Sequence, residues 1–196
     1  MPRLSFFQTY GTSLVWILFI LALLYVYSLP RYSLWFPTLP IYDNQEADIV
    51  ATETKLRNNE DADFFRQTDI SVVFAFAPHV PESPRELASI VATPFILYAG
   101  LWLKYFINRP RPYQIRSDID HLHSETGNTP AMPAGHAFQA YYLAHVLSKK
   151  YPEKRALFNE IAEKCDFVRI RAGIHYPSDG QFSKRLLRCL ISAGIM

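Results

Sequence analysis

The sequence contains three short groups of residues whose types and spacing suit chemistry on an anion. The first group is Lys104-x6-Arg111-Pro112, within "KYFINRPRP". Lys104 falls near the end of an apolar stretch that should be helical, and Pro110 and Pro112 end that helix. Arg111 should therefore stand on a rigid, extended loop, with Lys104 directed toward the same place. Taken alone, the group is more typical of a solvated arginine and a snorkelling lysine than of an anion site.

The second group is "MPAGH", residues 132–136. Gly135 lets the backbone turn tightly and brings its N–H close to a ligand. His136 should begin the next helix, where the helix dipole and the free N–H groups favour an anion. Taken alone, this pattern is weak evidence for a site.

The third group is "RIRAGIHYPSD", in which Arg169 precedes His175 by six residues and Asp179 follows it by four. Pro177 and Ser178 fit the first turn of a new helix, which places Asp179 near its N-terminus. A carboxylate at this spacing can accept a hydrogen bond from one imidazole nitrogen. That bond fixes the tautomer and leaves the other nitrogen nucleophilic. A purely structural His–Asp contact is the alternative.

Together and in this order, the three groups resemble the three-part signature of the type 2 phosphatidic acid phosphatase superfamily. That superfamily includes bacterial class A acid phosphatases, membrane lipid phosphatases and vanadium haloperoxidases. The resemblance covers about residues 84–179, and "GIHYPSD" is most similar to the acid phosphatase branch. It implies an all-α fold, a helical bundle of the acid phosphatase and haloperoxidase type.

The resemblance also implies a metal-independent phosphatase for phosphate monoesters, with no cofactor. His175 would attack phosphorus to form a phosphohistidine, and Asp179 would orient it. His136 would protonate the departing alcohol and then activate water for the second step. The expected phosphate-binding residues are the cations and the turn of the three groups, which supply charge and donors: Lys104, Arg111, Ala134, Gly135 and Arg169.

Two positions depart from the family pattern. Ala134 stands where the family usually has a serine that contacts the phosphate, and Val168 stands where a serine usually precedes the arginine of the third group. Both changes remove hydrogen bonding without removing charge. They keep open a catalytically weak phosphate-binding homologue, and the same anion pocket keeps open a vanadate-dependent haloperoxidase.

The first group must be positioned by an apolar helix expected over residues 84–106. Ser83 and Glu86 form a capping-box pattern at its start, and Pro94 should kink it. The 17 uncharged residues 87–103 are borderline for a membrane span. We interpret this helix as the central, buried helix of a soluble bundle.

Further helices are expected over residues 44–69, 137–151 and 152–171. The first of these is polar and charged, with Asp43 or Asn44 as its cap. The other two carry charged residues at helical spacing, which excludes them from lipid. Little chain follows the third group, so we expect a truncated closing helix.

The N-terminal part differs in composition from the rest of this 196-residue chain. Residues 4–30 contain no charged residue, and Leu14–Leu29 is almost wholly apolar. With its polar entry, this run approaches the ~20 residues that a transmembrane helix needs. We interpret it as a retained single-pass anchor, because the run is long and no A-x-A cleavage site follows it. A cleaved signal peptide and a buried hairpin helix are the alternatives.

The expected organisation is an anchor at 1–30, a proline-rich linker at 31–43 and an all-helical phosphatase-like domain at 44–196. Arg3 and Arg31 slightly favour a cytoplasmic N-terminus, which would place the domain on the extracytoplasmic or lumenal side. The net charge of +2 excludes a typical nucleic-acid binder. The expected partners are the membrane and a phosphorylated small molecule or lipid.

Two remaining features carry weaker expectations. "SDIDHLHSE", residues 117–125, has metal-ligand residue types, but we interpret it as a solvated loop bordering the substrate entrance. Cys165 and Cys189 lack metal-site spacing, and we expect two buried thiols rather than a disulfide.

Overall fold

The computed structural model describes residues 17–21 and 44–196. The chain divides into two units, Met1–Ser33 and Leu34–Met196. In the first unit, residues 17–21 are helical and their side chains are exposed. The rest of the expected anchor, the linker 31–43 and the expected cap Asp43 lie outside the described residues. The anchor and the domain boundaries therefore stay predictions.

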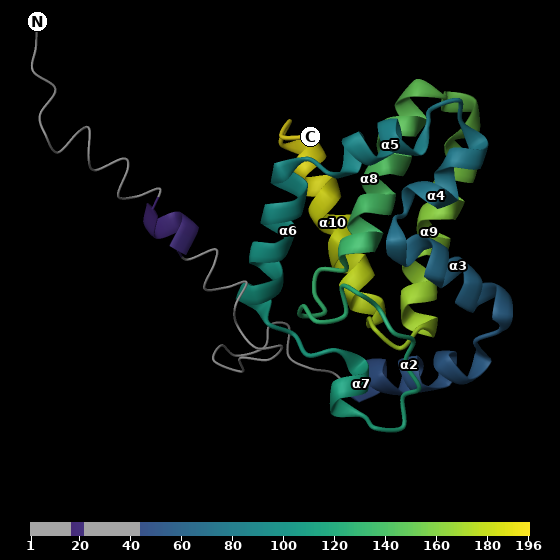
Figure 1. Cartoon of the computed structure of the whole chain (residues 1–196), viewed down its shortest axis with the longest axis vertical. Coiled ribbons are helices and arrows are strands. Elements are labelled where there is room, and N and C mark those ends of the chain that lie inside the picture. Colours follow the sequence, from purple (N-terminus) through teal and green to yellow (C-terminus); the bar gives the residue numbers. More distant parts are fainter. Residues whose placement is uncertain (1–16, 22–43) are drawn as a thin grey trace, which may run out of the picture. The chain divides into compact units, whose positions relative to one another are not determined.

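Within its described residues the second unit consists of helices and connecting loops, which confirms the predicted all-α class (Figure 1). The helices in chain order are α2 (Asn44–Leu56), α3 (Asn59–Ile70), α4 (Val73–Phe76), η1 (Ala77–His79), α5 (Pro84–Val91), α6 (Pro94–Ile107), α7 (Pro112–Ile115), α8 (Gly135–Lys150), η2 (Pro152–Lys154), α9 (Arg155–Arg171) and α10 (Pro177–Ser192). The helices expected over 137–151 and 152–171 correspond to α8 and to η2 with α9.

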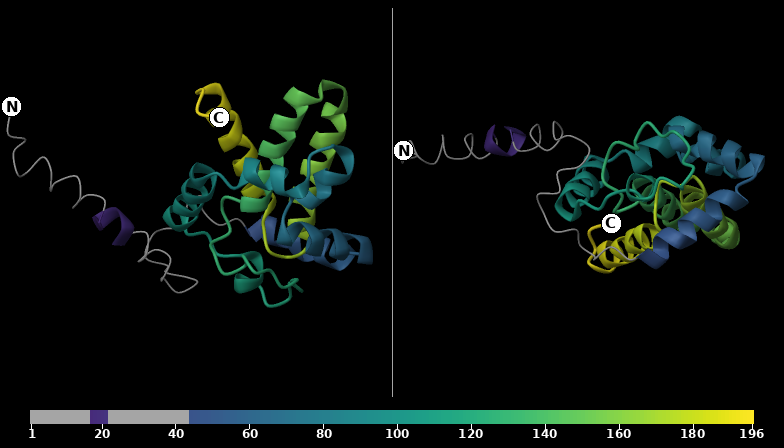
Figure 2. Two further views of the ribbon diagram at one scale, coloured as in Figure 1. Left: turned by 45° about the horizontal axis from the view of Figure 1, so that its top comes forward. Right: turned by 90° about the horizontal axis from the view of Figure 1, so that it is seen from below.

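The centre of this unit is the hairpin of α8 and α9, joined by the short turn η2 (Figure 2). The helix α10 packs against α8, while α2 and α3 pack against α9. The buried face of α8 carries Ala137, Ala140 and Ala144, none more than 1% exposed. These small side chains allow the neighbouring helices to approach closely, and Leu143 and Leu147 fill the space between them.

The polar region expected to be one helix over 44–69 forms two helices. The break follows Leu56, and Asn58 caps α3 by accepting a hydrogen bond from the backbone N–H of Asp61 at 2.9 Å. The Asp61 carboxylate in turn accepts a hydrogen bond from the backbone N–H of Asn58, which completes a capping box. This local pairing starts a second helix where composition alone predicts continuation.

The apolar helix expected over 84–106 is also two helices, with its break just before the predicted kink at Pro94. The capping box at Ser83 and Glu86 starts α5 as predicted. Pro94 then occupies the first turn of α6, because proline lacks the N–H that a continuous helix would need. The segments Pro84–Val91 and Ile96–Ile115 are bent by 50° relative to each other.

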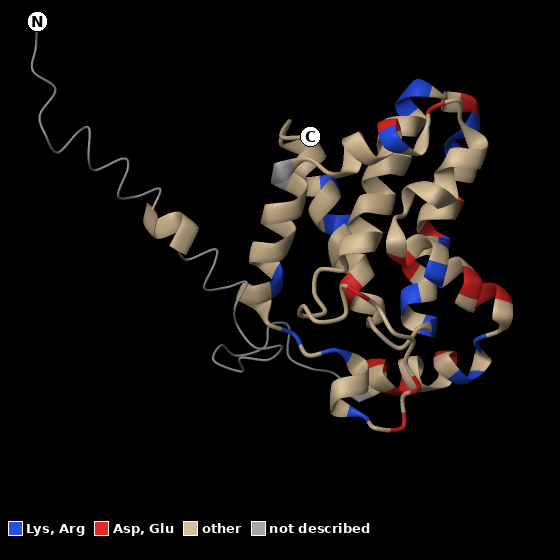
Figure 3. Ribbon diagram, in the orientation of Figure 1, with Lys and Arg blue, Asp and Glu red and all other residues tan. Residues whose placement is uncertain are grey.

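The prediction that this apolar segment is the buried centre of the bundle is wrong for α6. Its outer face exposes Tyr98, Trp102 and Phe106, at 38–69% of their surface. Lys104 is the single charged residue of α6, which is otherwise uncharged along its length (Figure 3). A helix that is apolar on every side does not reveal in its sequence which side packs.

Among the described residues, length and composition rule out a membrane crossing by any one helix. The segments Pro84–Val91 and Ile96–Ile115 together have the length and apolar composition of a membrane span, but only as a bent pair.

Two glycines test how tightly the helices pack. A Cβ on Gly180, in the first turns of α10, would overlap the carboxylate of Asp166 on α9, whereas a Cβ on Gly100 of α6 meets nothing within 4 Å. We expect Gly180→Ala to destabilise the protein by about 1–3 kcal/mol through overpacking. Gly100→Ala should instead stabilise it by roughly 0.5–1 kcal/mol, since alanine favours the helix. Urea unfolding of both variants measures these changes. Equal stability of Gly180→Ala and the wild type would contradict the close α9–α10 contact.

Candidate active site

The fold brings members of all three sequence groups to one cavity of about 480 Å³. Lys104 and Arg111 of the first group, Gly135 and His136 of the second and His175 of the third line it. Arg111 has the expected extended backbone, with φ −77° and ψ 156°, and His136 lies at the start of α8. Residues far apart in the sequence thus meet because helix ends converge there.

The predicted contact between His175 and Asp179 is present. Nδ1 of His175 lies 3.1 Å from Oδ2 of Asp179, and Nε2 lies 3.1 Å from Nη1 of Arg111. A guanidinium can only donate, so Nε2 is the acceptor and Nδ1 carries the proton that Asp179 accepts. Burial, together with Arg111 and Lys104, holds the pKa of His175 well below its usual value. The imidazole is therefore neutral, and its lone pair is on Nε2, beside the cavity.

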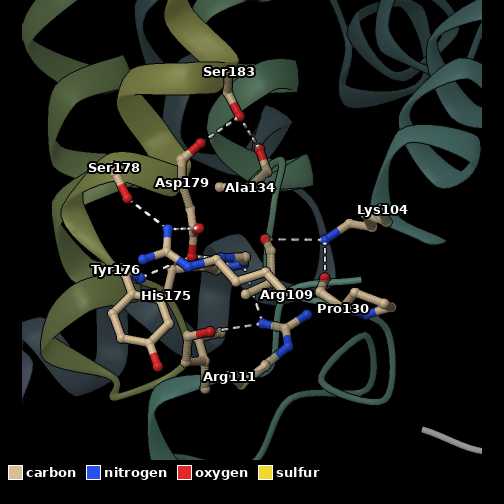
Figure 4. Close-up of polar contacts among 12 residues, drawn as sticks. Lys104, Arg109, Arg111, Pro130, Ala134, His175, Tyr176, Ser178, Asp179 and Ser183 are labelled. Atoms are coloured by element: carbon tan, nitrogen blue, oxygen red, sulfur yellow. Dashed lines mark hydrogen bonds and ion pairs between the residues drawn. The ribbon is translucent and has the colours of Figure 1, made fainter. Parts of the chain in front are cut away.

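Arg111 is fixed by the loop that precedes α8. Its Nε donates to the carbonyl of Thr129 at 2.9 Å, and Nη2 donates to the carbonyl of Thr126 at 3.1 Å. Nη1 donates to the carbonyl of Ile174 at 2.9 Å (Figure 4). The guanidinium is only 1% exposed, so its orientation toward His175 is set by carbonyls on both sides.

Lys104 reaches the same loop from the last turn of α6. Its Nζ donates to the carbonyl of Pro130 at 2.7 Å and lies 3.4 Å from that of Ala131 (Figure 4). Burial, and then the charge of Arg111, holds the pKa of Lys104 well below its usual value, while Asp179 opposes this. An anion in the cavity would favour the charged form of this amine.

Arg169 does not line the cavity, although it was predicted to bind the phosphate. It is fully buried behind the cavity wall, where Nη1 donates to Asp69 Oδ1 at 3.2 Å and Nη2 to Thr68 Oγ1 at 2.7 Å. Asp69 also contacts His136, whose Nε2 lies 3.1 Å from the Asp69 backbone carbonyl. Burial, followed by the charges of Arg169 and His175, lowers the pKa of His136.

Ala134 is fully buried in the core cluster around α8 and is absent from the cavity wall. It is the N-cap residue of α8, and its carbonyl accepts a hydrogen bond from Ser183 Oγ of α10 at 3.0 Å. Val168 is 1% exposed and packs with Phe65 and Ile174. Both positions that depart from the family pattern thus face packed core rather than the cavity.

Several residues around the site were not predicted from the sequence. Arg109 is 1% exposed, and it donates to Asp179 Oδ1 at 2.8 Å and to Glu46 Oε2 at 2.7 Å. Its only signal in the sequence is a second arginine in "RPRP". Glu46 of α2 and Asp69 of α3 come from polar helices in which nothing distinguishes them from their solvated neighbours.

The loop 117–125 lies beside the site but does not line the cavity, which is lined by Thr126 and Thr129 just after it. His123 lies 3.5 Å from Glu125 within the loop. Asp120 pairs with Arg57, and Ser124 Oγ donates to Asp69 Oδ1 at 2.8 Å. In the described part of the chain, no group of three or more His, Cys, Asp or Glu side chains is arranged to hold a metal ion. Of the two thiols, Cys165 is buried as expected, whereas Cys189 is exposed.

Most of the other side chains that line the cavity are apolar, and the polar ones among them are Asp69, Ser71, Thr126, Thr129 and Gln139. The apolar ones come from α5, α6, α8 and α10 and include Ala88, Val91, Leu103, Phe138, Leu186 and Leu190. The cavity therefore joins a cationic end containing two histidines to an apolar end.

Comparison with known proteins agrees with the fold and the motifs. A sequence model of the PAP2 superfamily, the type 2 phosphatidic acid phosphatases, matches residues 86–189. No curated protein sequence matched the chain. Among solved structures, the chain is similar to a transmembrane PAP2-type phosphatidylglycerolphosphate phosphatase from Bacillus subtilis, with 20% identity and a TM-score of 0.52. The match covers 78% of this chain and 84% of that one, and it shows a shared fold.

The position of Ala134 generates a prediction about stability. A serine at this N-cap should accept a hydrogen bond from the N–H of His136 or Ala137, which adds about 0.5–2 kcal/mol. We expect Ala134→Ser to raise the melting temperature by roughly 2–4 °C per kcal/mol.

The matched control is Ala137→Ser, which adds the same atom at an equally buried position within α8 and should lower the melting temperature. A lower melting temperature for Ala134→Ser would show that the pocket around the cap has no room for a hydroxyl. Measuring kcat/KM on the same samples tests whether the hydroxyl also reaches the phosphate.

Proposed function

The chain belongs to the PAP2 superfamily, and we propose that it is a phosphatase that hydrolyses lipid phosphate monoesters through a phosphohistidine intermediate. The observation that carries this proposal is the cavity itself. One end holds His136, His175 and two cations, and the other end is apolar. A phosphate with an apolar tail matches both ends at once.

In the first step, Nε2 of His175 attacks phosphorus, and the bond from phosphorus to the ester oxygen breaks. Arg111 transfers its hydrogen bond from Nε2 to a phosphate oxygen, which frees the attacking lone pair. His136 gives a proton to the departing alkoxide, so the product is a neutral alcohol. The geometry that supports this step is the tautomer of His175, with its proton on Nδ1 toward Asp179.

In the second step, water attacks the phosphohistidine, and His136, now neutral, takes a proton from that water. The P–N bond breaks, its electron pair returns to Nε2 of His175, and phosphate is released. His136 is neutral in the empty site, because burial and nearby cations lower its pKa. The negative charge of a bound phosphate favours the protonated form that the first step needs.

Lys104 and Arg111 supply the fixed positive charge at the cationic end of the cavity. Both now donate to backbone carbonyls, and both line the space where the phosphate would lie. Such preorganised donors stabilise the charge that develops on the transferring phosphoryl group. Arg169 would contribute its charge from behind the wall, across its ion pair with Asp69.

The position of Arg169 supports a second candidate, a catalytically weak phosphate-binding homologue. Its guanidinium is engaged by Asp69 and Thr68, and Ala134 brings no hydroxyl into the cavity. Such a protein would bind phosphate or vanadate with little turnover.

The histidine roles generate a prediction that separates nucleophile from general acid. With 4-nitrophenyl phosphate, whose leaving group needs little protonation, His136→Ala should retain trapping of a phosphoenzyme, while His175→Ala should lose it. With an alkyl phosphate, both variants should lose turnover. Acid-labile labelling and single-turnover kinetics give the readouts. A phosphoenzyme that persists in His175→Ala but is lost in His136→Ala would reverse the assignment, and tight vanadate binding without wild-type turnover would favour the second candidate.

The apolar end of the cavity generates a prediction about the tail. For monoalkyl phosphates of four to eight carbons, below their micelle concentrations, kcat/KM should rise about fourfold per methylene, the equivalent of ~0.8 kcal/mol per buried CH₂. Gly100 lines the cavity and has open space around it, so Gly100→Leu should fill part of the tail site. This variant should abolish the dependence on chain length and leave hydrolysis of 4-nitrophenyl phosphate nearly unchanged.

The matched control is Tyr98→Leu, a substitution on the exposed outer face of α6 that is absent from the cavity wall. It should keep the full dependence on chain length. If wild-type kcat/KM does not vary with chain length, the apolar end does not bind the tail.

A further inference from the structure

We propose that Arg109, held in place by Glu46, is a positioning residue for Asp179: it keeps the Asp179 carboxylate ionised and directed at His175. This inference rests on the proposed phosphatase function, because Asp179 acts there through the histidine nucleophile. It connects Arg109 and Asp179, inside the matched family region, with a residue outside that region, since Glu46 lies before residue 86.

The geometry gives each oxygen of Asp179 its own donor (Figure 4). Oδ1 accepts from Nη1 of Arg109 at 2.8 Å. Oδ2 accepts from the backbone N–H of Tyr176 at 2.8 Å and from Nδ1 of His175 at 3.1 Å. The carboxylate therefore cannot rotate without breaking the bond to Arg109, and its second oxygen stays in line with the imidazole.

Glu46 connects this network to α2 and to the start of α10. Its Oε2 accepts from Nη2 of Arg109 at 2.7 Å, and its Oε1 accepts from the backbone N–H of Ser178 at 2.7 Å. Ser178 Oγ is the third partner, 2.7 Å from Oε2 of Glu46 and 2.5 Å from Nη1 of Arg109. Glu46 thus fixes Arg109 relative to the helical turn that carries Asp179.

Besides packing, Arg109 affects the pKa of Asp179 through its charge. Asp179 is completely buried, and burial raises the pKa of its carboxyl. Arg109 is the strongest of the groups that oppose this rise. The charged or titratable groups that face Asp179 from the surrounding elements are Lys104, Arg109, Arg111, Asp166 and His175. Glu46 does not face Asp179 directly but accepts a hydrogen bond from Arg109.

Arg109 acts through Asp179 and not on the substrate. Its side chain is 1% exposed and absent from the cavity wall, and two carboxylates offset its charge. Its guanidinium also lies 4.1 Å from the centre of the Tyr176 ring. A cation placed in this way contributes little to phosphate affinity.

The consequence for His175 follows from proton positions. An ionised Asp179 accepts the Nδ1 proton and leaves Nε2 bare for attack. A protonated Asp179 would donate to Nδ1, and the neutral imidazole would then carry its proton on Nε2, where nucleophilicity is lost. Loss of Arg109 should therefore reduce the rate of phosphoryl transfer rather than the binding of phosphate.

The test compares Arg109→Gln, Arg109→Lys and Glu46→Gln with the wild-type full chain, using 4-nitrophenyl phosphate from pH 4 to pH 9. We expect Arg109→Gln to lower kcat by about tenfold to a hundredfold with little change in KM. The acid limb of its kcat profile should move to higher pH by about 1–3 units, because a carboxyl without its cation ionises later. Arg109→Lys keeps the charge and should recover part of kcat with the acid limb near its original pH.

Glu46→Gln provides the matched control, since it loosens Arg109 while removing a negative charge. It should lower kcat without moving the acid limb to higher pH. If Arg109→Gln and Glu46→Gln both lose activity with unchanged pH profiles, Arg109 is only structural and the inference fails. A larger effect on KM than on kcat in Arg109→Gln would equally overturn it.

The tautomer of His175 can also be measured directly, without turnover. In ¹⁵N-histidine NMR spectra, His175 of the wild type should show a protonated Nδ1 and a bare Nε2, and Arg109→Gln should shift toward the opposite tautomer. Orthovanadate binding should change by less than about threefold, since Lys104 and Arg111 remain. An unchanged tautomer in folded Arg109→Gln refutes the inference, whereas Arg109→Lys should keep the wild-type tautomer because it keeps the charge beside Asp179. Absence of wild-type hydrolysis, with the expected tautomer shift present, refutes the proposed function alone.

Discussion

The central constraint on this structure is the collection of four cations in one low-dielectric region. Each charge taken from water carries a desolvation cost that must be offset by partners. Arg109 is offset by Asp179 and Glu46, and Arg169 is offset by Asp69. Lys104 and Arg111 donate to backbone carbonyls, which carry partial charge only. Both side chains line the cavity, so an anion bound there would lie beside them.

The cations come together because several helix ends converge at the site. The start of α8 and the start of α10 are tied to each other, since Ser183 Oγ donates both to the carbonyl of Ala134 and to that of Asp179. The positive ends of two helix dipoles are therefore held at the site by short hydrogen bonds. The left-handed residue Asn108, with φ 50°, ends α6 and turns the chain so that Arg109 and Arg111 follow it inward.

Local spacing explains which parts were predictable. The extended backbone of Arg111, the helix starts near His136 and Pro177 and the His175–Asp179 contact all depend on residues within a few positions of one another. Proline, glycine and helix geometry fix such relations in the sequence itself.

Partners across the fold were not predictable in this way. Glu46 and Asp69 are acidic residues on polar helices, and only the packing of α2 and α3 against α9 selects them from their neighbours. The burial of Ala134 and the withdrawal of Arg169 behind the wall also depend on that packing, because a motif specifies residue types but not the direction of each side chain. The exposure of α6 was missed for a related reason, since its apolar residues surround the helix axis.

That exposure connects the fold to the proposed substrate. The inner side of α6 forms part of the cavity wall and supplies Lys104 to its cationic end, while the outer side presents Tyr98, Trp102 and Phe106 to the surroundings. Tyrosine and tryptophan are the residues that favour the boundary between a membrane and water. The helix α6 thus lies between the mostly apolar cavity and an apolar outer surface. A lipid whose tail lies in a membrane and whose phosphate must reach His175 would meet compatible surfaces on both sides of α6. A small soluble phosphate ester would use only the cationic end.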